Sequence, residues 1–329
     1  ERISLSYDST TVVSDLDLTI EEGTITTIIG PNGCGKSTML RALARLMKPS
    51  GGAVLLDGQA IHEMPSREVA RRLGLLSQQA QVPAGVTVEE LAHRGRYPHQ
   101  SFLQPPTARD QAAVERALEL AGMTGLRHRQ VNELSGGQRQ RAWIAMALAQ
   151  ETPMLLLDEP TTYLDIAHQL EVMELVERLN REEGRTIVMV LHDINDAARV
   201  SDRLVAMRDG RIIGDGPPSE VLNAELLTEL FGVTCDVLPH PAPIRCNGYC
   251  VPRSRASIRS GNLATNTTGF AINNARTGYG STIISDDLTI SIPGGKITAL
   301  VGPNGSGKST LMRTCARLQK LNAGTIHLD

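Results

Sequence analysis

The sequence lacks a long apolar run and an excess of basic residues, and both shortages exclude classes of protein. No apolar run approaches the roughly 18–20 residues that a membrane-spanning helix needs. Its 33 Lys and Arg residues nearly balance 36 Asp and Glu residues, giving a formal net charge of −3. A general nucleic-acid-binding domain is usually strongly basic. We therefore expect a globular cytosolic protein that does not bind nucleic acid.

Cysteines are few and scattered. The five positions are Cys34, Cys235, Cys246, Cys250 and Cys315. An odd, dispersed set fits a reducing compartment better than a disulfide framework. Cys246 and Cys250 are spaced C-x₃-C. A zinc site needs about four ligands, and adding His240 to these two cysteines does not complete one. We therefore interpret them as ordinary thiols.

Acidic residues are missing from residues 237–285, and an initiator Met is missing at Glu1. The acid-free stretch is rich in Pro, Arg, Ser, Asn and Thr, which is typical of a solvated linker. Both ends of the chain have the residue pattern of a strand, so we expect a fragment cut at both ends. The predicted domains are 1–252, a linker at 253–269, and 270–329.

An internal repeat underlies this division. Residues 7–57 match residues 279–329 at a constant offset of 272, without gaps and with about half of the positions identical. Such a match is far beyond chance and predicts one nearly complete domain followed by the truncated start of a second copy.

Within the first copy, short apolar runs alternate with helical patterns. Residues 25–29, 154–157 and 186–191 have the composition of buried strands. Apolar residues recur at helical spacing at Met39, Leu40, Leu43 and Leu46, and again at Ile166, Leu170, Met173 and Leu179. An alternating strand is also expected through Leu16, Leu18 and Ile20. This alternation predicts an α/β fold with a parallel sheet covered on both faces.

A glycine-rich segment, GPNGCGKST at 30–38, fits G-x-x-x-x-G-K-[ST] between an expected strand and an expected helix. Its amides and the following helix N-terminus favour a phosphate chain. Lys36 can reach the β- and γ-phosphates, and Ser37 can bind Mg²⁺. Cys34 is either a small residue that fits the loop or a thiol of lowered pKa beside Lys36. The repeat carries GPNGSGKST at 302–310.

Two acids, Asp158 and Glu159, end the apolar run at 154–157. Ligands collect at the carboxyl edge of parallel sheets, and successive side chains of an extended segment point in opposite directions. We assign Asp158 to Mg²⁺, directly or through water, and Glu159 to the attacking water as general base.

The sequence LSGGQ at 134–138 adds a third element. Ser135 with Gln138 forms a capping-box pattern before an Ala-rich segment at 139–149, which predicts a helix there. Gly136 and Gly137 would expose amides at the start of this helix, which suggests a second anion site.

Together these motifs resemble the ATP-binding subunits of ABC transporters, over about 1–252 and again at 270–329. The resemblance implies a P-loop NTPase with a RecA-like parallel-sheet core, an N-terminal antiparallel β subdomain and an α-helical signature subdomain. It also implies that two such domains enclose two ATP molecules, the phosphate loop of one facing the signature of the other. The second domain is expected either from a homodimer or from a tandem copy in the same chain.

The resemblance assigns roles residue by residue. It implies catalytic roles for Glu159, His192, Lys36 and Gln78, and Mg²⁺ binding by Ser37, Gln78 and Asp158. Asp165 lies where a loop communicates between the two sites, and His192 lies where the γ-phosphate is sensed. The nucleotide-binding set is Tyr7, Gly30, Pro31, Asn32, Gly33, Cys34, Gly35, Lys36, Ser37, Thr38, Ser135, Gly136, Gly137, Gln138 and Asp165, with Tyr279, Gly302, Asn304, Gly305, Gly307, Lys308, Ser309 and Thr310 in the repeat.

Longer sequence segments narrow the resemblance to one group of transporters. AHRGRYPHQ at 92–100 and TTYLDIAHQ at 161–169 are similar to ferric-siderophore importer ATPases, although heme and cobalamin importers share much of them. This resemblance implies transmembrane permease subunits as partners, a substrate-binding protein indirectly, and a peripheral location at the cytoplasmic face of the inner membrane. Residues 95–103 are expected at the surface near the permease.

Two other classes fit less well. A soluble tandem ABC protein acting on translation would have a longer, charged, helical linker. A chromosome-organising or DNA-repair ATPase would have a coiled coil between phosphate loop and signature, but Lys36 and Ser135 are only 99 residues apart.

Overall fold

The computed structural model divides the chain into two units, Glu1–Arg255 and Ala256–Asp329. It describes residues 1–8, 10–77, 85–100, 105–162, 164–239, 248–252, 270–279, 282–292, 308–316 and 320–328. Among the helices in these ranges, none is both long and apolar enough to cross a bilayer.

The first unit is built on a six-stranded sheet of order β10-β9-β3-β8-β7-β6. Its strands are β3 (Ile25–Ile29), β6 (Leu73–Leu76), β7 (Met154–Asp158), β8 (Thr186–Val190), β9 (Arg203–Arg208) and β10 (Arg211–Gly216). Neighbouring strands are parallel except at the antiparallel β9–β10 edge. Every residue of β3 and β8 is buried, as expected for strands covered on both faces. The predicted parallel core is confirmed.

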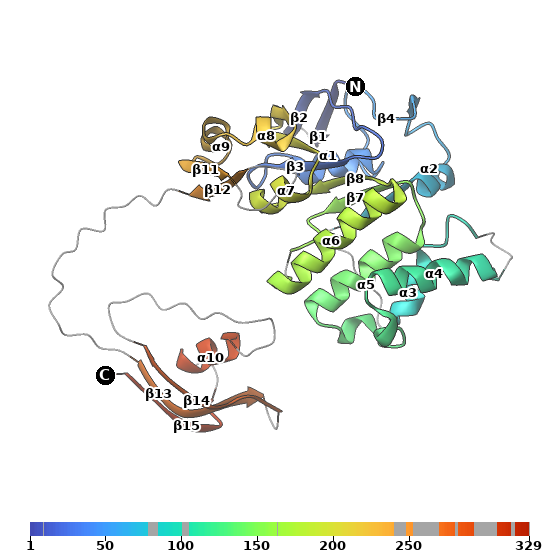
Figure 1. The fold of residues 1–329 in the computed structure, drawn as a ribbon. Helices are drawn as coiled ribbons and strands as arrows, with labels where there is room; N and C mark the ends of the chain where they lie inside the picture. The colour runs from blue at the N-terminus through green and yellow to red at the C-terminus, as the bar shows by residue number, and fades with distance from the viewer. Residues whose placement is uncertain are drawn as a thin grey trace. The chain divides into compact units, whose positions relative to one another are not determined.

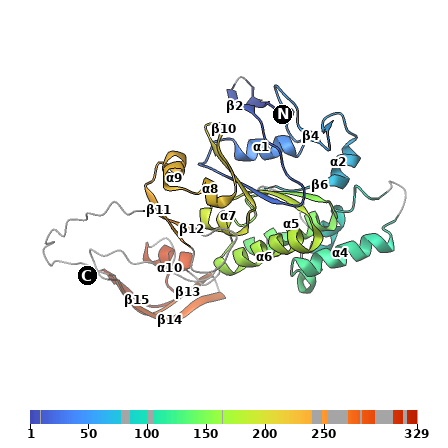
Figure 2. The ribbon, with the colours of Figure 1, turned by 45° about the horizontal axis from the view of Figure 1, so that its top comes forward.

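Helices cover both faces of this sheet, and side-chain alternation separates two apolar layers. On one face, Ile28 and Val188 pack with residues of α1 (Lys36–Leu43). On the other, Ile29 and Met189 pack with α5 (Gly136–Ala149), α6 (Ile166–Glu183) and α7 (Ile194–Val200). Figures 1 and 2 show α1 and the α5–α6 pair on opposite sides of the strands.

Short antiparallel strands form a separate layer beside α1. They are β1 (Ile3–Tyr7) paired with β2 (Thr10–Leu16), and β4 (Leu55–Leu56) paired with β5 (Gln59–Ala60). The expectation that Leu18 and Ile20 continue the strand of Leu16 is wrong, because β2 ends at Leu16. Both residues nevertheless pack against the core from outside a strand.

A helical layer contains α3 (Val88–Arg94), α4 (Ala108–Leu120) and α5, with short 3₁₀ turns at Thr124–Leu126 and Val131–Glu133. The helix α2 (Ser66–Arg72) packs instead in the apolar layer of α1 through Val69. Capping boxes at Thr87, Thr107 and Ser135 begin α3, α4 and α5, satisfying amides at each helix start. The unit ends with α8 (Pro218–Val221), α9 (Ala224–Phe231), β11 (Cys235–Pro239) and β12 (Gly248–Pro252).

Three apolar residues expected on helical core faces are exposed instead. Leu46 lies beyond the end of α1 and is 63% exposed. Ile166 and Leu170 lie in the first turns of α6 and are 78% and 43% exposed, whereas Met173 and Leu179 are buried. Periodicity therefore identified the helices but extended their apolar faces past the region that packs.

The described residues of the second unit form a three-stranded antiparallel sheet and one helix. Its strands β13 (Phe270–Tyr279), β14 (Thr282–Ile292) and β15 (Ala323–Leu328) lie in the order β14-β13-β15, and its helix is α10 (Lys308–Cys315). A residue pairing of the first unit is repeated in the second. Ser4 bridges Gly51 in the first unit, and Arg276 pairs with Ala323 at the equivalent positions of the second.

Candidate nucleotide site

The glycine-rich loop between β3 and α1 has a backbone that only glycine accommodates at two positions. Gly30 has φ 151°, and a Cβ there would lie 2.1 Å from the carbonyl oxygen of Met207. Gly35 has φ 104° and would meet Val13 Cγ2 at 2.9 Å. Since Gly35 precedes α1 without a side-chain cap, the first turn presents its amides to an anion. The loop can therefore cradle a phosphate chain.

Lys36 lies folded back over this loop. Its side chain is 5% exposed, and Nζ donates to the carbonyls of Gly30 and Pro31, both at 2.8 Å. An ammonium group is thus held at the mouth of the phosphate cradle, as its predicted role requires. Of the two interpretations of Cys34, the thiol of lowered pKa is contradicted, because burial raises the pKa of Cys34 and outweighs the opposing effect of Lys36.

The two predicted Mg²⁺ ligands from distant parts of the sequence meet here. Ser37 Oγ on α1 donates to Asp158 Oδ1 at the end of β7, at 3.0 Å. Asp158 is 8% exposed, and burial raises its pKa, with Glu159 adding to the effect and Ser37 opposing it. A nearby cation would relieve this cost, and hydroxyl and carboxylate oxygens are the ligand types that Mg²⁺ prefers. The donor set therefore fits Mg²⁺.

Glu159 and His192 are in direct contact. Oε1 of Glu159 lies 2.6 Å from Nε2 of His192, and Oε2 accepts from Thr162 Oγ1 at 3.0 Å. Glu159 has φ 51°, a left-handed conformation that is costly for a non-glycine residue, and its N–H donates to Val190 at 3.2 Å. The backbone thus turns at the strand end and presents a doubly oriented carboxylate at the same edge as Asp158.

Tyr7 on β1 lies beside α1. Arg41 NH1 donates to the Tyr7 hydroxyl at 3.2 Å, and this hydrogen bond, with a second from Thr38, lowers the pKa of Tyr7. The residue is 44% exposed, so the ring is held near the phosphate loop while open to a ligand.

The signature residues begin α5 as the capping box predicted. The N–H of Gln138 donates to Ser135 Oγ at 3.3 Å, and the N–H of Ser135 donates to Gln138 Oε1 at 3.2 Å. Ser135 and Gly136 are exposed, and a Cβ on Gly136 would meet no atom within 4 Å. This helix start is therefore open to a partner. Asp165, at the start of α6, accepts the N–H of His168 at 3.0 Å.

Several predicted positions lie outside the described residues. They are Gln78 and, in the repeat, Gly302, Asn304, Gly305 and Gly307. Lys308 begins α10 and Thr310 is buried within it.

Two contributors to the site were missed by sequence reasoning. Thr162, three residues after Glu159, has a detectable signal because a hydroxyl at that spacing can reach back across a turn. Met207 contributes only its backbone carbonyl, which lies against Gly30, and no sequence pattern indicates such a contact.

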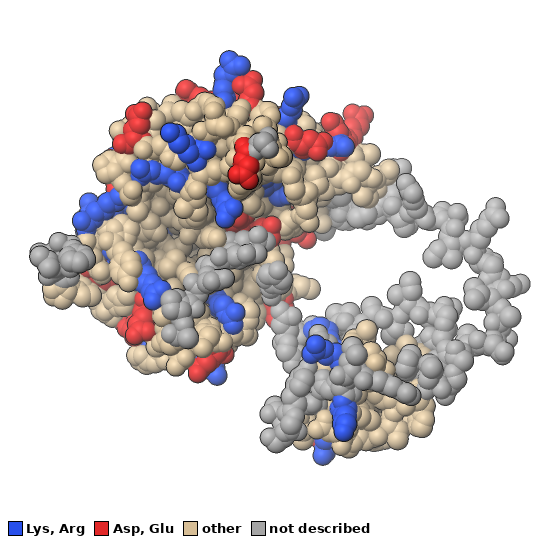
Figure 3. Space-filling view, turned by 180° about the vertical axis from the view of Figure 1, so that it is seen from behind, with Lys and Arg blue, Asp and Glu red and all other residues tan. Residues whose placement is uncertain are grey.

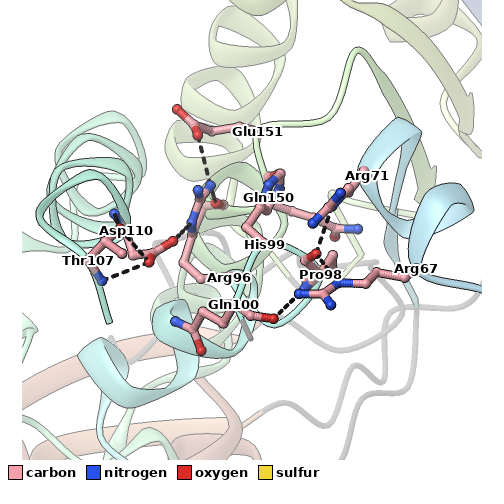
Figure 4. Close-up of polar contacts among 11 residues, drawn as sticks. Arg67, Arg71, Arg96, Pro98, His99, Gln100, Thr107, Asp110, Gln150 and Glu151 are labelled. Atoms are coloured by element: carbon pink, nitrogen blue, oxygen red, sulfur yellow. Dashed lines mark hydrogen bonds and ion pairs between the residues drawn. The ribbon is translucent and has the colours of Figure 1, made fainter. Parts of the chain in front are cut away.

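In the described part of the segment expected near a permease, residues 95–100, Gly95 and Arg96 are buried rather than at the surface. Arg96 is 1% exposed and donates from Nε to Asp110 at 2.9 Å and from NH1 to Ala149 O at 2.7 Å (Figure 4). Burial alone would raise the pKa of Asp110, but hydrogen bonds from Thr107 and Arg96 lower it to about 2. The segment is thus anchored on α4 and α5.

Pro98, in the same segment, is held by α2. Arg67 and Arg71 donate to the carbonyl of Pro98 at 2.9 and 2.8 Å (Figure 4). Tyr97, between Arg96 and Pro98, is 64% exposed. The result is a firmly held turn that presents an aromatic ring to solvent.

On the face drawn in Figure 3, basic and acidic side chains of the first unit are interspersed rather than gathered by sign. Extended nucleic-acid contact requires a concentration of positive charge. That nucleic acid is not a partner stays a prediction.

Comparison with known proteins places this geometry among ATP-binding cassettes. The family model described as ABC transporter matches residues 13–162 and 285–329. The ferric enterobactin transport ATP-binding protein FepC of Escherichia coli is 51% identical over 241 residues, covering 73% of this chain and 89% of that protein. The iron(3+)-hydroxamate import ATP-binding protein FhuC of Bacillus subtilis is 47% identical, covering 73% and 90%.

A solved structure agrees with these matches. The dimeric ATP-binding cassette MJ0796, bound to ADP and Pi, has a TM-score of 0.60 and 30% identity, covering 66% of this chain and 97% of that one. The predicted P-loop α/β architecture is confirmed.

Proposed function

Since the chain belongs to the ABC transporter family, we propose that it is the ATP-hydrolysing subunit that drives import of ferric siderophores. The observation that carries the siderophore assignment is the identity of about half with FepC and FhuC over nearly their whole length. The observation that carries hydrolysis is the meeting of Lys36, Ser37, Asp158, Glu159 and His192 at one sheet edge.

ATP is bound in this proposal by the phosphate loop and by Tyr7. The amides of the loop and of the first turn of α1 bind phosphate oxygens, because glycines leave room for close approach. Lys36 exchanges its two carbonyl partners for the β- and γ-phosphates, which as anions are stronger acceptors. Tyr7 stacks on the adenine from its position beside α1.

Mg²⁺ is held by Ser37 and Asp158, with Gln78 as a predicted third ligand. When bound, the ion neutralises negative charge on the phosphates. Asp158 provides the charge that retains the cation, and Ser37 joins the cation site to the phosphate loop because it lies on α1.

Glu159 accepts a proton from the attacking water as general base. Thr162 orients one carboxylate oxygen, and His192 holds the other. A γ-phosphate competes for the same imidazole N–H, so nucleotide arrival withdraws His192 from Glu159 and leaves Oε1 for water. In this way binding of the γ-phosphate at His192 controls whether Glu159 is available to act as the base.

The working ATPase in this proposal is a dimer of first units, supported by the dimeric MJ0796 cassette. The exposed signature turn, from Ser135 to Gln138, completes the nucleotide site of the opposite copy, and Asp165 lies between the two sites. Transmembrane permease subunits contact the turn that presents Tyr97. This arrangement locates the protein peripherally, at the cytoplasmic face of the inner membrane, with a substrate-binding protein as an indirect partner.

The test is complementation of an E. coli strain that lacks FepC, measured as uptake of radiolabelled iron supplied as ferric enterobactin. The same measurement is made in a strain of B. subtilis that lacks FhuC and is supplied with a ferric hydroxamate. This second strain is included because the chain could fail to bind the permease of one host. Restored uptake with the wild-type chain, but not with Glu159→Gln, supports the proposal. Failure in both strains, with restoration of heme or cobalamin uptake in strains lacking those ATPases, contradicts it.

A further inference from the structure

The first turn of α5, which carries the signature residues, packs against the segment that links β7 to α6 in the same chain. Gln140 Nε2 donates to the carbonyl of Pro160 at 3.2 Å. A Cβ on Gly137 would lie 3.3 Å from Leu164 Cδ2 and 3.8 Å from Cγ of His168. Glycine at this position therefore permits a close approach of the helix start to the linking segment.

The same segment starts at the hydrolytic carboxylate. Thr162 donates its N–H to the Glu159 carbonyl at 3.2 Å and its hydroxyl to the Glu159 carboxylate at 3.0 Å. Further along, Asp165 Oδ1 accepts from Nδ1–H of His168 at 2.5 Å. The imidazole is thus held between Asp165 and Gly137, so a short run of residues connects Glu159 physically to the signature turn.

We propose that Gln140 and His168 are positioning residues that fix the signature turn on Pro160 and Asp165 of their own chain. In the dimer, a change at Glu159 moves the linking segment and with it the signature turn that faces the nucleotide of the other copy. The two ATP sites are therefore coupled through Gln140 and His168. This inference rests on the proposed function only in requiring that two copies enclose ATP.

The contacts assign the two side chains different tasks. Gln140 supplies a donor to a backbone carbonyl, so it fixes the distance between α5 and Pro160. His168 supplies a donor to Asp165 and a flat surface beside Gly137, so it fixes the orientation of the signature turn. Losing either task weakens communication between sites without removing a group that binds nucleotide within one copy.

The experiment uses the full chain with Gln140→Ala, His168→Ala and the double substitution. Each is measured alone for ATP affinity at concentrations where the protein is monomeric. Each is also combined with Glu159→Gln and measured for ATP-dependent dimerisation by analytical ultracentrifugation. We expect ATP affinity within about twofold of wild type and a dimer dissociation constant raised about tenfold, within the range typical of coupling between sites. The Hill coefficient of ATP hydrolysis should fall towards one.

Isosteric variants distinguish positioning from general stability. Gln140→Glu keeps the shape but faces the Pro160 carbonyl with an acceptor, so it should behave like Gln140→Ala. His168→Asn keeps a donor within reach of Asp165 and should restore at least part of the cooperativity. Exposed matched controls are Gln111→Ala on α4 and His128→Ala, which should change neither quantity. If an alanine variant unfolds, the dimerisation and Hill coefficient of Gln140→Glu and His168→Asn test the inference in its place.

Two failures are distinguishable. If the Glu159→Gln parent does not dimerise with ATP, the proposed two-copy site is wrong. If the parent dimerises and the Gln140 and His168 variants dimerise equally with an unchanged Hill coefficient, this inference is overturned.

Discussion

At the residue scale, the most informative contact is between Glu159 and His192. Each was assigned a separate role from the sequence, one as base and one as phosphate sensor. Their 2.6 Å contact between carboxylate and imidazole brings the two predicted roles together. The contact depends on the left-handed turn at Glu159 after β7, which aims the carboxylate at His192, two residues beyond the end of the neighbouring strand β8.

Glu159→Gln should retain ATP binding and lose hydrolysis. An amide keeps the shape of the carboxylate but does not accept a proton, and a positioned general base typically contributes about 10²–10⁴-fold. The measurements are nucleotide affinity and steady-state phosphate release. Near-normal turnover would refute the assignment of Glu159 as base.

Lys36→Ala should lose ATP affinity itself, because it removes the ammonium group from the phosphate cradle. A hydrogen bond to a charged group is worth about 1.5–3 kcal/mol, so we expect affinity to fall by roughly 10- to 100-fold. Isothermal titration with ATP measures this. Lys48→Ala, at an exposed lysine outside the phosphate loop, is the matched control, and an unchanged dissociation constant for Lys36→Ala would contradict the assigned role.

At the element scale, Arg96 joins the start of α4 to the end of α5. Arg96→Met should destabilise the first unit by about 3–5 kcal/mol, because it leaves the Asp110 carboxylate buried without its partner. The measurement is urea unfolding followed by circular dichroism. The control is Arg109→Met, at an exposed position of α4, which should change the free energy of unfolding by less than about 0.5 kcal/mol. Equal losses of stability in the two variants would contradict a special role for Arg96.

Asp110 should also give this region a defined pH dependence. Its folded pKa of about 2 lies below the ordinary 3.8. A lowered folded pKa contributes stability that is present above about pH 3.8 and is lost as pH falls towards 2. The loss should be at most about 2 kcal/mol. Unfolding of wild type and Asp110→Asn, compared between about pH 5 and pH 2, measures it, and identical profiles would exclude Asp110 as the source.

At the scale of the whole molecule, the two units differ in how much core they contain. The buried apolar residues described in the second unit are Ile272, Ala275 and Leu311, whereas the first unit has two large apolar layers. A three-stranded sheet with one short helix buries little surface and is marginally stable.

The second unit should therefore exchange its amide hydrogens much faster than the first. We expect β13–β15 to open with free energies near zero, while β3 and β8 exchange near the global limit. Hydrogen exchange of the full chain, read by mass spectrometry, tests this, with β3 and β8 as the internal reference. Strong protection of residues 270–279 and 323–328 in a monomer would contradict it.

Prediction from the sequence succeeded where local chemistry is sufficient. The phosphate loop, the buried strands and the capping box at Ser135 follow from residue type and spacing, because each depends on neighbours within a few positions. It failed where packing decides. Ile166 and Leu170 have helical periodicity but are exposed, and Cys34 lies beside Lys36 but is buried enough for desolvation to raise its pKa.

The sequence by itself determined that this protein contains a phosphate loop, a pair of acids at a strand end and a signature turn, and that the first of these is repeated. Those features are carried by contiguous residues. Only the tertiary structure decided that Ser37 meets Asp158, that Glu159 meets His192, and that Gln140 and His168 brace the signature turn. These pairs come from different elements, and their contacts depend on strand order and helix packing, which no local pattern specifies.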